Sequence, residues 1–159
     1  MMVELRKISW DNWEECLDLE VADEQKDFVA PNNYSLAQSY IHLTNDDTPP
    51  FSYAIYHDDV MVGYTLYFYS AADKDDPDDE DCYYICRFMI DKQYQGKGYG
   101  REGMLKVLEH IKTFPHGKTN IVVLSYEPEN TIAKKMYESL GFVETGEIDD
   151  GELVAKLVL

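Results

Sequence analysis

The feature that most constrains this sequence is a glycine-rich loop between an apolar strand and a helix. Residues 83–90 are apolar on both faces apart from Arg87, which is typical of a strand in the middle of a sheet. Glycines follow at positions 96, 98 and 100, and a helix is predicted from about Gly98 to Lys112. Its apolar face is expected to contain Met104, Leu105, Leu108 and Ile111.

The loop is suited to holding an anion. The first backbone N–H groups of a helix have no partner inside the helix, and the helix dipole is positive at that end. Glycine lets a phosphate approach the backbone closely, and Lys97 and Arg101 add positive charge in an otherwise acidic chain. We therefore expect a phosphate-bearing ligand here.

Two common phosphate-binding motifs fit the loop poorly. A nucleoside triphosphate loop requires Gly-Lys-Ser/Thr, but Gly96-Lys97 is followed by Gly98. Gly98, Gly100 and Gly103 match the dinucleotide pattern G-x-G-x-x-G. A dinucleotide fold would begin with this unit, whereas here about 80 residues containing a hairpin precede it, so we set this match aside.

Strand and helix patterns alternate without a repeat or linker, which predicts one domain over residues 1–159. Helices are expected after Ser9, after Ser35 as N-cap, from Gly98, and over residues 130–140 before Gly141. The nearly all-charged run 73–81 is expected to be an exposed loop. Seven strands are expected, at residues 3–8, 51–56, 60–69, 83–90, 120–126, 142–148 and 153–158.

Charge and composition exclude several classes of function. The formal net charge of −17 repels nucleic acid and anionic membranes, and it attracts a small cationic ligand. No apolar run approaches the roughly 18 residues of a membrane helix, and residues 1–10 lack a signal-peptide pattern, so we expect a cytoplasmic protein. Cys16, Cys82 and Cys86 lack metal-site spacing, and no metal is expected.

Several short motifs together resemble those of the GNAT superfamily of N-acetyltransferases. Residues 95–100 read Q-x-x-G-x-G, preceded by Phe88-Met89-Ile90-Asp91 and followed by Asn130, Ala133, Tyr137 and Gly141-Phe142. More narrowly, R-F-x-I-D-x-x-Y-Q-G-K-G at residues 87–98 and G-E-x-D at 146–149 resemble bacterial spermine/spermidine acetyltransferases. The resemblance implies an α/β GNAT fold, whose central, mixed and mostly antiparallel seven-stranded sheet is splayed between strands 4 and 5 and flanked by about four helices.

The resemblance also implies how acetyl-CoA is bound as cosubstrate. The loop would hold the pyrophosphate, the strand backbone would pair with the pantetheine arm, and an N–H near Phe88 would polarise the thioester oxygen. Tyr137 is the expected general acid for the departing thiolate, while Asn130 is equally expected to be a helix N-cap. The residues assigned to the cofactor are Phe88, Met89, Ile90, Gln95, Gly96, Lys97, Gly98, Tyr99, Gly100, Arg101, Asn130, Ala133 and Tyr137.

The general base and the acceptor amine are left open by the sequence. Many relatives have a carboxylate on the central strand, where this chain has Tyr84 and Cys86. A base could instead be reached through water at Glu127, at Glu129 or in the acidic segment 23–27. Acceptor contacts are therefore expected from Asp23, Glu24, Asp27, Tyr84, Cys86 and Glu127.

Three readings of the function follow. The first is a polyamine N-acetyltransferase acting on spermidine or spermine. The second keeps the fold but changes the acceptor to an aminoglycoside, another small amine or a protein N-terminus. The third is a CoA-binding sensor without activity. Because relatives are often dimers, a homodimer is expected.

Overall fold

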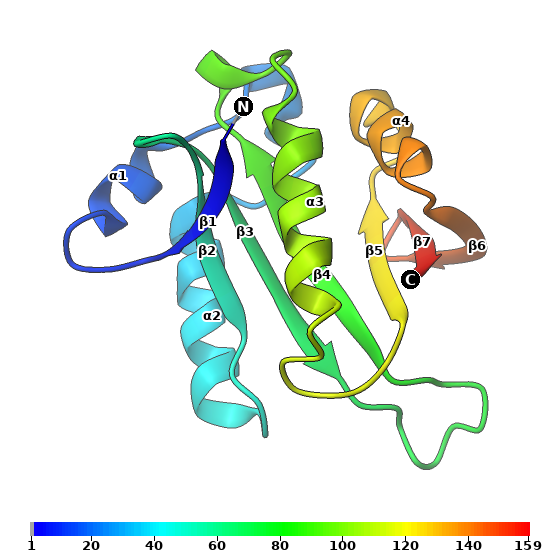
Figure 1. Ribbon diagram of the computed structural model, residues 1–159. Helices are drawn as coiled ribbons and strands as arrows, with labels where there is room; N and C mark the ends of the chain where they lie inside the picture. The colour runs from blue at the N-terminus through cyan, green and yellow to red at the C-terminus, as the bar shows by residue number, and fades with distance from the viewer. Residues whose placement is uncertain (1) are drawn as a thin grey trace.

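The computed structural model of the protein describes residues 2–159 and is built around one seven-stranded sheet (Figure 1). The strand order is β1-β2-β3-β4-β5-β7-β6, and every neighbouring pair is antiparallel except β4 and β5, which are parallel. The expected mixed, mostly antiparallel sheet is confirmed. The strands are β1 (Val3–Lys7), β2 (Phe51–His57), β3 (Val60–Ser70), β4 (Cys82–Ile90), β5 (Ile121–Tyr126), β6 (Val143–Asp149) and β7 (Glu152–Val158).

Helices cover both faces of the sheet. A buried cluster that includes Cys16, Tyr64 and Leu66 joins the N-terminal helices to one face. A second cluster, including Tyr83 and Tyr137, joins the later helices to the other face, and α3 lies in front of the sheet in Figure 1. The α-helices are α1 (Trp13–Asp18), α2 (Asn32–Asn45), α3 (Tyr99–Ile111) and α4 (Thr131–Ser139), and two short 3-10 helices are η1 (Asp23–Gln25) and η2 (Lys92–Tyr94).

Two helices begin elsewhere than expected. Pro31 stands at the N-cap of α2, so Ser35 lies inside the helix, where it is fully buried and its N–H donates to the Pro31 carbonyl. The fixed φ of proline suits the start of a helix, so α2 begins after Pro31 without a serine cap. Asn12, rather than Ser9, is the N-cap of α1.

The packing of α3 against the sheet depends on Gly103. A Cβ at this position would lie 3.2 Å from Ile55 Cγ2 and 3.3 Å from Phe88 Cζ, so a larger residue would push the helix away. This close approach explains a glycine inside a helix, where it otherwise costs about 1 kcal/mol. The expectation for Leu105 is wrong, because this side chain is 39% exposed. The buried face of α3 consists of Gly103, Met104, Val107, Leu108 and Ile111.

The sheet opens between β4 and β5. The two strands pair only where Tyr83–Ile85 meet Val122–Leu124, and β4 then continues to Ile90 without β5 beside it. At the same place the pairing of β3 with β4 shifts by one residue, so Cys86 has no partner opposite it. Figure 1 shows β4 and β5 diverging toward the upper end of the sheet. The expected splay is therefore confirmed.

The acidic loop, residues 73–81, extends from the lower end of the sheet in Figure 1, away from the opening between β4 and β5. Residues 73–81 are exposed, as expected, and their side chains mostly accept hydrogen bonds from backbone N–H groups of the same loop. Within residues 2–159 no helix is both long and apolar enough to cross a bilayer. Over the same residues no group of His, Cys, Asp and Glu side chains is arranged to hold a metal ion.

Candidate active site

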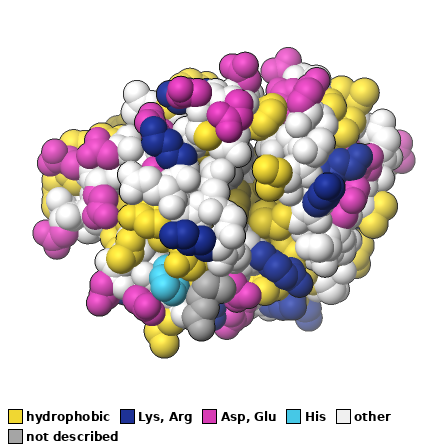
Figure 2. Space-filling model, turned by 90° about the horizontal axis from the view of Figure 1, so that it is seen from above, with side chains coloured by type: hydrophobic (Ala, Val, Ile, Leu, Met, Phe, Trp, Pro, Cys, Tyr) yellow, Lys and Arg dark blue, Asp and Glu magenta, His cyan; other side chains and the backbone are white. Residues whose placement is uncertain are grey.

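A pocket of about 690 Å³ opens where β4 and β5 separate. Its walls come from the second half of β4, the end of β5, the glycine loop, α4 and residues 25–31. Figure 2 shows the molecule from above, with hydrophobic side chains inside a central hollow. Acidic side chains crowd the upper edge of this face, and Lys and Arg side chains lie below and beside the hollow (Figure 2).

The glycine loop presents a row of free backbone donors. Gly98 is the N-cap of α3 with φ +87°, and Gly96 has φ +78°, so both adopt the left-handed conformation that favours glycine. Within residues 2–159 none of the consecutive N–H groups from Gln95 to Arg101 donates a hydrogen bond. Unpaired donors at the positive end of a helix suit the pyrophosphate of CoA, so the residues present fit this group.

Gln95 positions this loop rather than offering its amide to the pocket. Its Nε2 donates to the Ile90 carbonyl and to Gln25 Oε1, both at 2.9 Å. Asp91 braces the same turn, because its buried carboxylate accepts from the N–H groups of Glu20 and Gln93 at 2.8 and 3.0 Å. The loop therefore has a defined place relative to β4.

Two of the loop residues that were assigned to the cofactor, Lys97 and Tyr99, do not line the pocket. Lys97 is exposed, and its Nζ lies 5.9 Å from the centre of the Tyr94 ring. Tyr99 stacks on His57, with ring centres 4.6 Å apart. The remaining loop residues assigned to the cofactor, Gln95, Gly96, Gly98, Gly100 and Arg101, do line it.

The end of β4 forms one wall of the pocket. Phe88, Met89 and Ile90 all line it, as expected, and the β4 edge that faces β5 is left unpaired here. Arg87 also lines the pocket, although no role was predicted for it from the sequence. Its guanidinium donates to the Cys86 carbonyl at 2.8 Å and to Gln38 Oε1 at 3.2 Å, while its buried Nε has no partner within the described residues.

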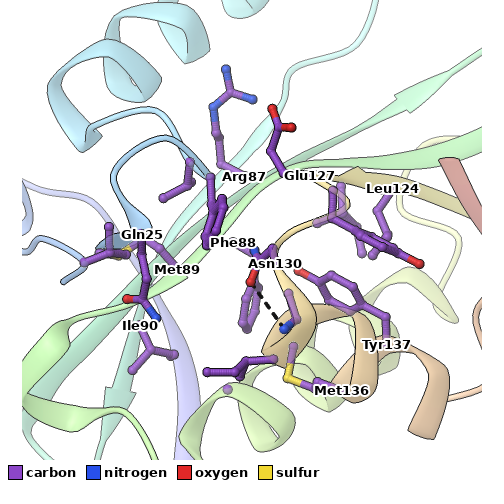
Figure 3. Close-up of a pocket in the computed structure, with 18 of the residues that line it drawn as sticks. Gln25, Arg87, Phe88, Met89, Ile90, Leu124, Glu127, Asn130, Met136 and Tyr137 are labelled. Carbon is purple, nitrogen blue, oxygen red and sulfur yellow. Dashed lines mark hydrogen bonds between the residues drawn. The ribbon is translucent and has the colours of Figure 1, made fainter. Parts of the chain in front are cut away.

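Tyr137 forms part of the opposite wall and points from α4 into the pocket (Figure 3). It is 8% exposed and packs beside the rings of Tyr126 and Phe142, at 5.7 and 5.8 Å. Burial, with a smaller contribution from the charge of Glu152, raises the pKa of this phenol well above its ordinary value. The hydroxyl makes no hydrogen bond within residues 2–159 and keeps its proton at neutral pH, as a proton donor must.

Asn130 lies at the start of α4, as expected for a helix N-cap. Its side chain accepts from the Ala133 N–H at 3.4 Å, the bond that is dashed in Figure 3, so the N-cap role is confirmed. Asn130 and Ala133 both line the pocket, and so does Met136, which sequence reasoning missed. The cap fixes the end of α4 that faces the opening.

Carboxylates gather around Glu127, which lies at the end of the pocket where Figure 3 also labels Arg87. Asp27, Glu127, Asp150 and Glu152 all line it. Desolvation raises the pKa of Glu127, and the charges of Glu152, Glu129, Asp150 and Asp27 raise it further in that order. A cation placed here would relieve this mutual repulsion.

Cys86 lines the pocket close to this acidic end. Burial raises the pKa of its thiol, the charge of Glu152 adds to the shift, and Arg87 opposes it. A protonated thiol is a weak nucleophile. Cys86 is therefore poorly suited to act as a nucleophile here.

Three of the expected acceptor contacts lie outside the pocket lining. Asp23 forms an ion pair with Lys26 at 3.0 Å, and Glu24 is exposed on η1. The Tyr84 hydroxyl lies 3.1 Å from Ser125 Oγ, behind the wall. Sequence reasoning missed Gln25, Ser125, Asp150 and Glu152, which line the pocket. The acidic residues on both sides of Gly151 were the available signal for the last two.

Comparison with known proteins agrees with this geometry. The acetyltransferase (GNAT) family matches the chain over residues 2–142. A spermine/spermidine N(1)-acetyltransferase of Bacillus subtilis (strain 168) is 26% identical over 160 residues, covering 97% of each chain. A probable spermine N(1)-acetyltransferase of Bacillus subtilis subsp. natto (strain BEST195) is 27% identical with the same coverage.

Solved structures share the fold at lower identity. An aminoglycoside acetyltransferase in complex with coenzyme A superposes with a TM-score of 0.76 and 16% identity, over 99% of this chain and 95% of that one. The PaiA N-acetyltransferase of Thermoplasma acidophilum, also in complex with coenzyme A, gives 0.70 and 13% over the whole of both chains. The chain therefore belongs to the acetyltransferase (GNAT) family, with acetyl-CoA as the cosubstrate expected of it.

Proposed function

We propose that this acetyltransferase acetylates a primary amine of a polyamine such as spermidine or spermine. The observation that carries the proposal is the acidic end of the pocket, to which Asp27, Glu127, Asp150 and Glu152 contribute. Within residues 2–159 none of these four carboxylates forms an ion pair with a cationic side chain. Several carboxylates along one cleft suit an acceptor that carries several ammonium groups. The names of the two Bacillus relatives agree with this choice.

The cofactor would be held on the other side of the same opening. The free N–H groups from Gln95 to Arg101 would bind the pyrophosphate, and the unpaired edge of β4 at Phe88–Ile90 would orient the pantetheine arm. Acetyl-CoA supplies an activated thioester. Met136 and Ala133 would exclude water from the arm, because both lie on the α4 wall of the pocket.

Two groups of the chain would serve the transfer itself. The Phe88 N–H would stabilise the negative charge that develops on the carbonyl oxygen as the C–N bond forms. The Tyr137 hydroxyl holds a proton on the opposite wall, and it would give this proton to the departing sulfur as the C–S bond breaks. The acylated nitrogen then has one proton to lose, and this proton would restore the Tyr137 phenol, directly or through water. A cytoplasmic location and a homodimer stay predictions from the sequence.

The main alternative is another polycationic acceptor. Aminoglycosides also carry several ammonium groups, so the same acidic end could receive one. The fold neighbours that act on aminoglycosides are below 20% identity and speak for the fold alone. The choice between polyamine and aminoglycoside therefore depends on assay.

The test measures CoA release at pH 7.5 with spermidine, spermine, an aminoglycoside and a peptide with a free N-terminus. We expect turnover with a polyamine, and a KM for it that rises with ionic strength because the pocket attracts it by charge. Glu127→Gln should raise that KM by roughly tenfold, since a charge-assisted contact is lost. No turnover of either polyamine at millimolar concentration would contradict the proposal.

A matched control is available on the outer face of α4. Glu138 is exposed and does not line the pocket. Glu138→Gln changes the net charge by the same amount as Glu127→Gln. Equal effects of the two variants on KM would show that only the overall charge of the protein matters.

A further inference from the structure

A chain of hydrogen bonds fixes one carboxylate in the pocket. Ser125 Oγ lies 2.9 Å from Glu152 Oε1 and donates to it, and the Tyr84 hydroxyl lies 3.1 Å from the same Ser125 oxygen. A serine hydroxyl has a single proton and an ionised carboxylate can only accept, so Tyr84 must donate to Ser125 and Ser125 to Glu152. The chain therefore points in one direction and orients Glu152.

The three residues of this hydrogen-bond chain come from three different strands. Tyr84 lies on β4, Ser125 on β5, and Glu152 begins β7, directly after the Asp150-Gly151 turn. One carboxylate oxygen, Oε1, is occupied by the serine. Within residues 2–159 the other, Oε2, accepts no hydrogen bond and forms no ion pair, and Glu152 lines the pocket.

The charge of Glu152 reaches both the donor and the acceptor parts of the pocket. It raises the pKa of the Tyr137 phenol on α4, after the larger effect of burial. It has the same secondary effect on Cys86 and Tyr84 on β4, and it is the largest charge acting on Glu127. Of the four carboxylates at this end, Glu152 is the one whose charge acts on Tyr137.

We propose that Glu152 binds the reacting ammonium group of the acceptor and takes a proton from it, a role that rests on the proposed function. One N–H bond of the ammonium breaks, an O–H bond forms at Glu152 Oε2, and the electron pair stays on nitrogen as the lone pair needed for attack. After product release the carboxylic acid returns its proton to water. A primary amine with a pKa of about 10.4 needs such a step at neutral pH.

Glu127 is less suited to this step. Its carboxylate accepts no hydrogen bond within residues 2–159, so its orientation is not fixed, and Figure 3 shows it beside Arg87 at one end of the pocket. Asp27 and Asp150 are exposed at the rim. These three carboxylates are placed to hold the distal ammonium groups, while Glu152 receives the reacting one.

The decisive variant is Glu152→Gln, which keeps an oxygen for Ser125 but removes the charge. We expect kcat for the acceptor to fall by about 10²-fold or more, with the KM for acetyl-CoA unchanged. Activity of the variant should rise with pH toward the acceptor pKa, because the free amine then no longer needs a base. Glu138→Gln should match wild type in every respect.

Two results would overturn the assignment. One is a Glu152→Gln variant whose kcat and pH profile equal those of wild type. The other is a variant with normal kcat and raised acceptor KM alone, which would make Glu152 a binding residue only. Ser125→Ala should reproduce part of the pH shift, because Ser125 is a positioning residue, and Ser125→Thr should restore the wild-type profile.

A binding experiment separates failure of this inference from failure of the proposed function. Calorimetry with CoA-bound protein measures spermidine affinity without turnover, and Glu152→Gln should weaken it by about tenfold or more. Wild-type protein that binds spermidine but never acetylates it would refute the proposed function and leave the ammonium contact measurable. Equal affinities in wild type and Glu152→Gln would refute the Glu152 inference.

Discussion

The amide of Gln95 donates to Gln25 Oε1 at 2.9 Å, and this bond joins the glycine loop to the acidic segment 23–27. Gln25 Oε1 also accepts from the Ala22 N–H at 3.1 Å, so one oxygen ties two backbone segments together. The cofactor side and the acceptor side of the site are therefore mechanically connected. A substitution at either glutamine should therefore loosen both the glycine loop and the acidic segment.

A double-mutant cycle tests this connection. Gln25→Ala and Gln95→Ala should show a coupling of about 1 kcal/mol in the free energy of unfolding, the usual contribution of a neutral hydrogen bond. Urea denaturation measures it. Gln95→Ala combined with Gln38→Ala is the control, because Gln38 contacts Arg87 instead, and this pair should be additive. If the effects of Gln25→Ala and Gln95→Ala on the free energy of unfolding are additive, the two side chains are not coupled.

Tyr137→Phe should separate chemistry from binding. The hydroxyl makes no hydrogen bond within residues 2–159, so its loss should change stability and CoA affinity little. Because the phenol is the proposed proton donor, kcat should fall by about 10²-fold or more. Steady-state kinetics and calorimetry with CoA measure the two effects. A fully active variant would exclude Tyr137 as the acid.

Gly98→Val should abolish CoA binding. Gly98 has φ +87°, which a β-branched residue rarely adopts, and a side chain here would disturb the row of free N–H groups. Gly146→Val is a matched control, because Gly146 has φ +90° but lies on the exposed strand β6. Calorimetry with CoA should find weakened affinity only in the first variant. Unchanged affinity in Gly98→Val would refute the pyrophosphate assignment.

We expect the protein to lose stability in mild acid because His110 is partly buried. The Tyr67 hydroxyl and His110 Nδ1 share a hydrogen bond of 2.6 Å, and burial lowers the pKa of the imidazole, with His116 adding to the shift. Since the unfolded state, with a pKa of about 6.5, binds the proton more tightly, stability is complete above that pH and falls as pH drops through it. Urea unfolding at pH 7.5 and 5.5 measures the change.

Two variants check the origin of that slope. His110→Gln should flatten the dependence of stability on pH between 7.5 and 5.5, since no imidazole remains to titrate. Tyr67→Phe removes the hydrogen bond but keeps His110 buried. Because burial is the main cause of the lowered pKa of His110, most of the slope should remain. A wild-type slope in His110→Gln would show that another group is responsible.

The sequence predicted the elements that depend on local pattern. Seven strands, four α-helices and the glycine loop before α3 follow from periodicity and from the small size of glycine. The start of α2 at Asn32 was missed, because a proline in the N-cap position gives the same boundary as a serine cap. The exposure of Leu105 was missed since helical spacing alone cannot say how wide the buried face is.

The acceptor side of the site was harder to predict. Glu152 reaches the pocket only because β7 is inserted between β5 and β6, which brings its first residue beside Ser125. No spacing along the chain encodes that proximity. Asp23 was predicted to line the pocket, but its side chain pairs with Lys26 on the surface. The charge of a residue does not determine which way its side chain points.

The short ladder between β4 and β5 has a consequence for how the molecule holds together. Three residue pairs, at Tyr83–Ile85, are the whole register by which β5, β7 and β6 join the first four strands. A ligand that fills the gap beyond Ile85 completes the sheet that the chain alone leaves unfinished. Such a ligand acts as a removable strand, and amide exchange in β5 should slow when it is bound.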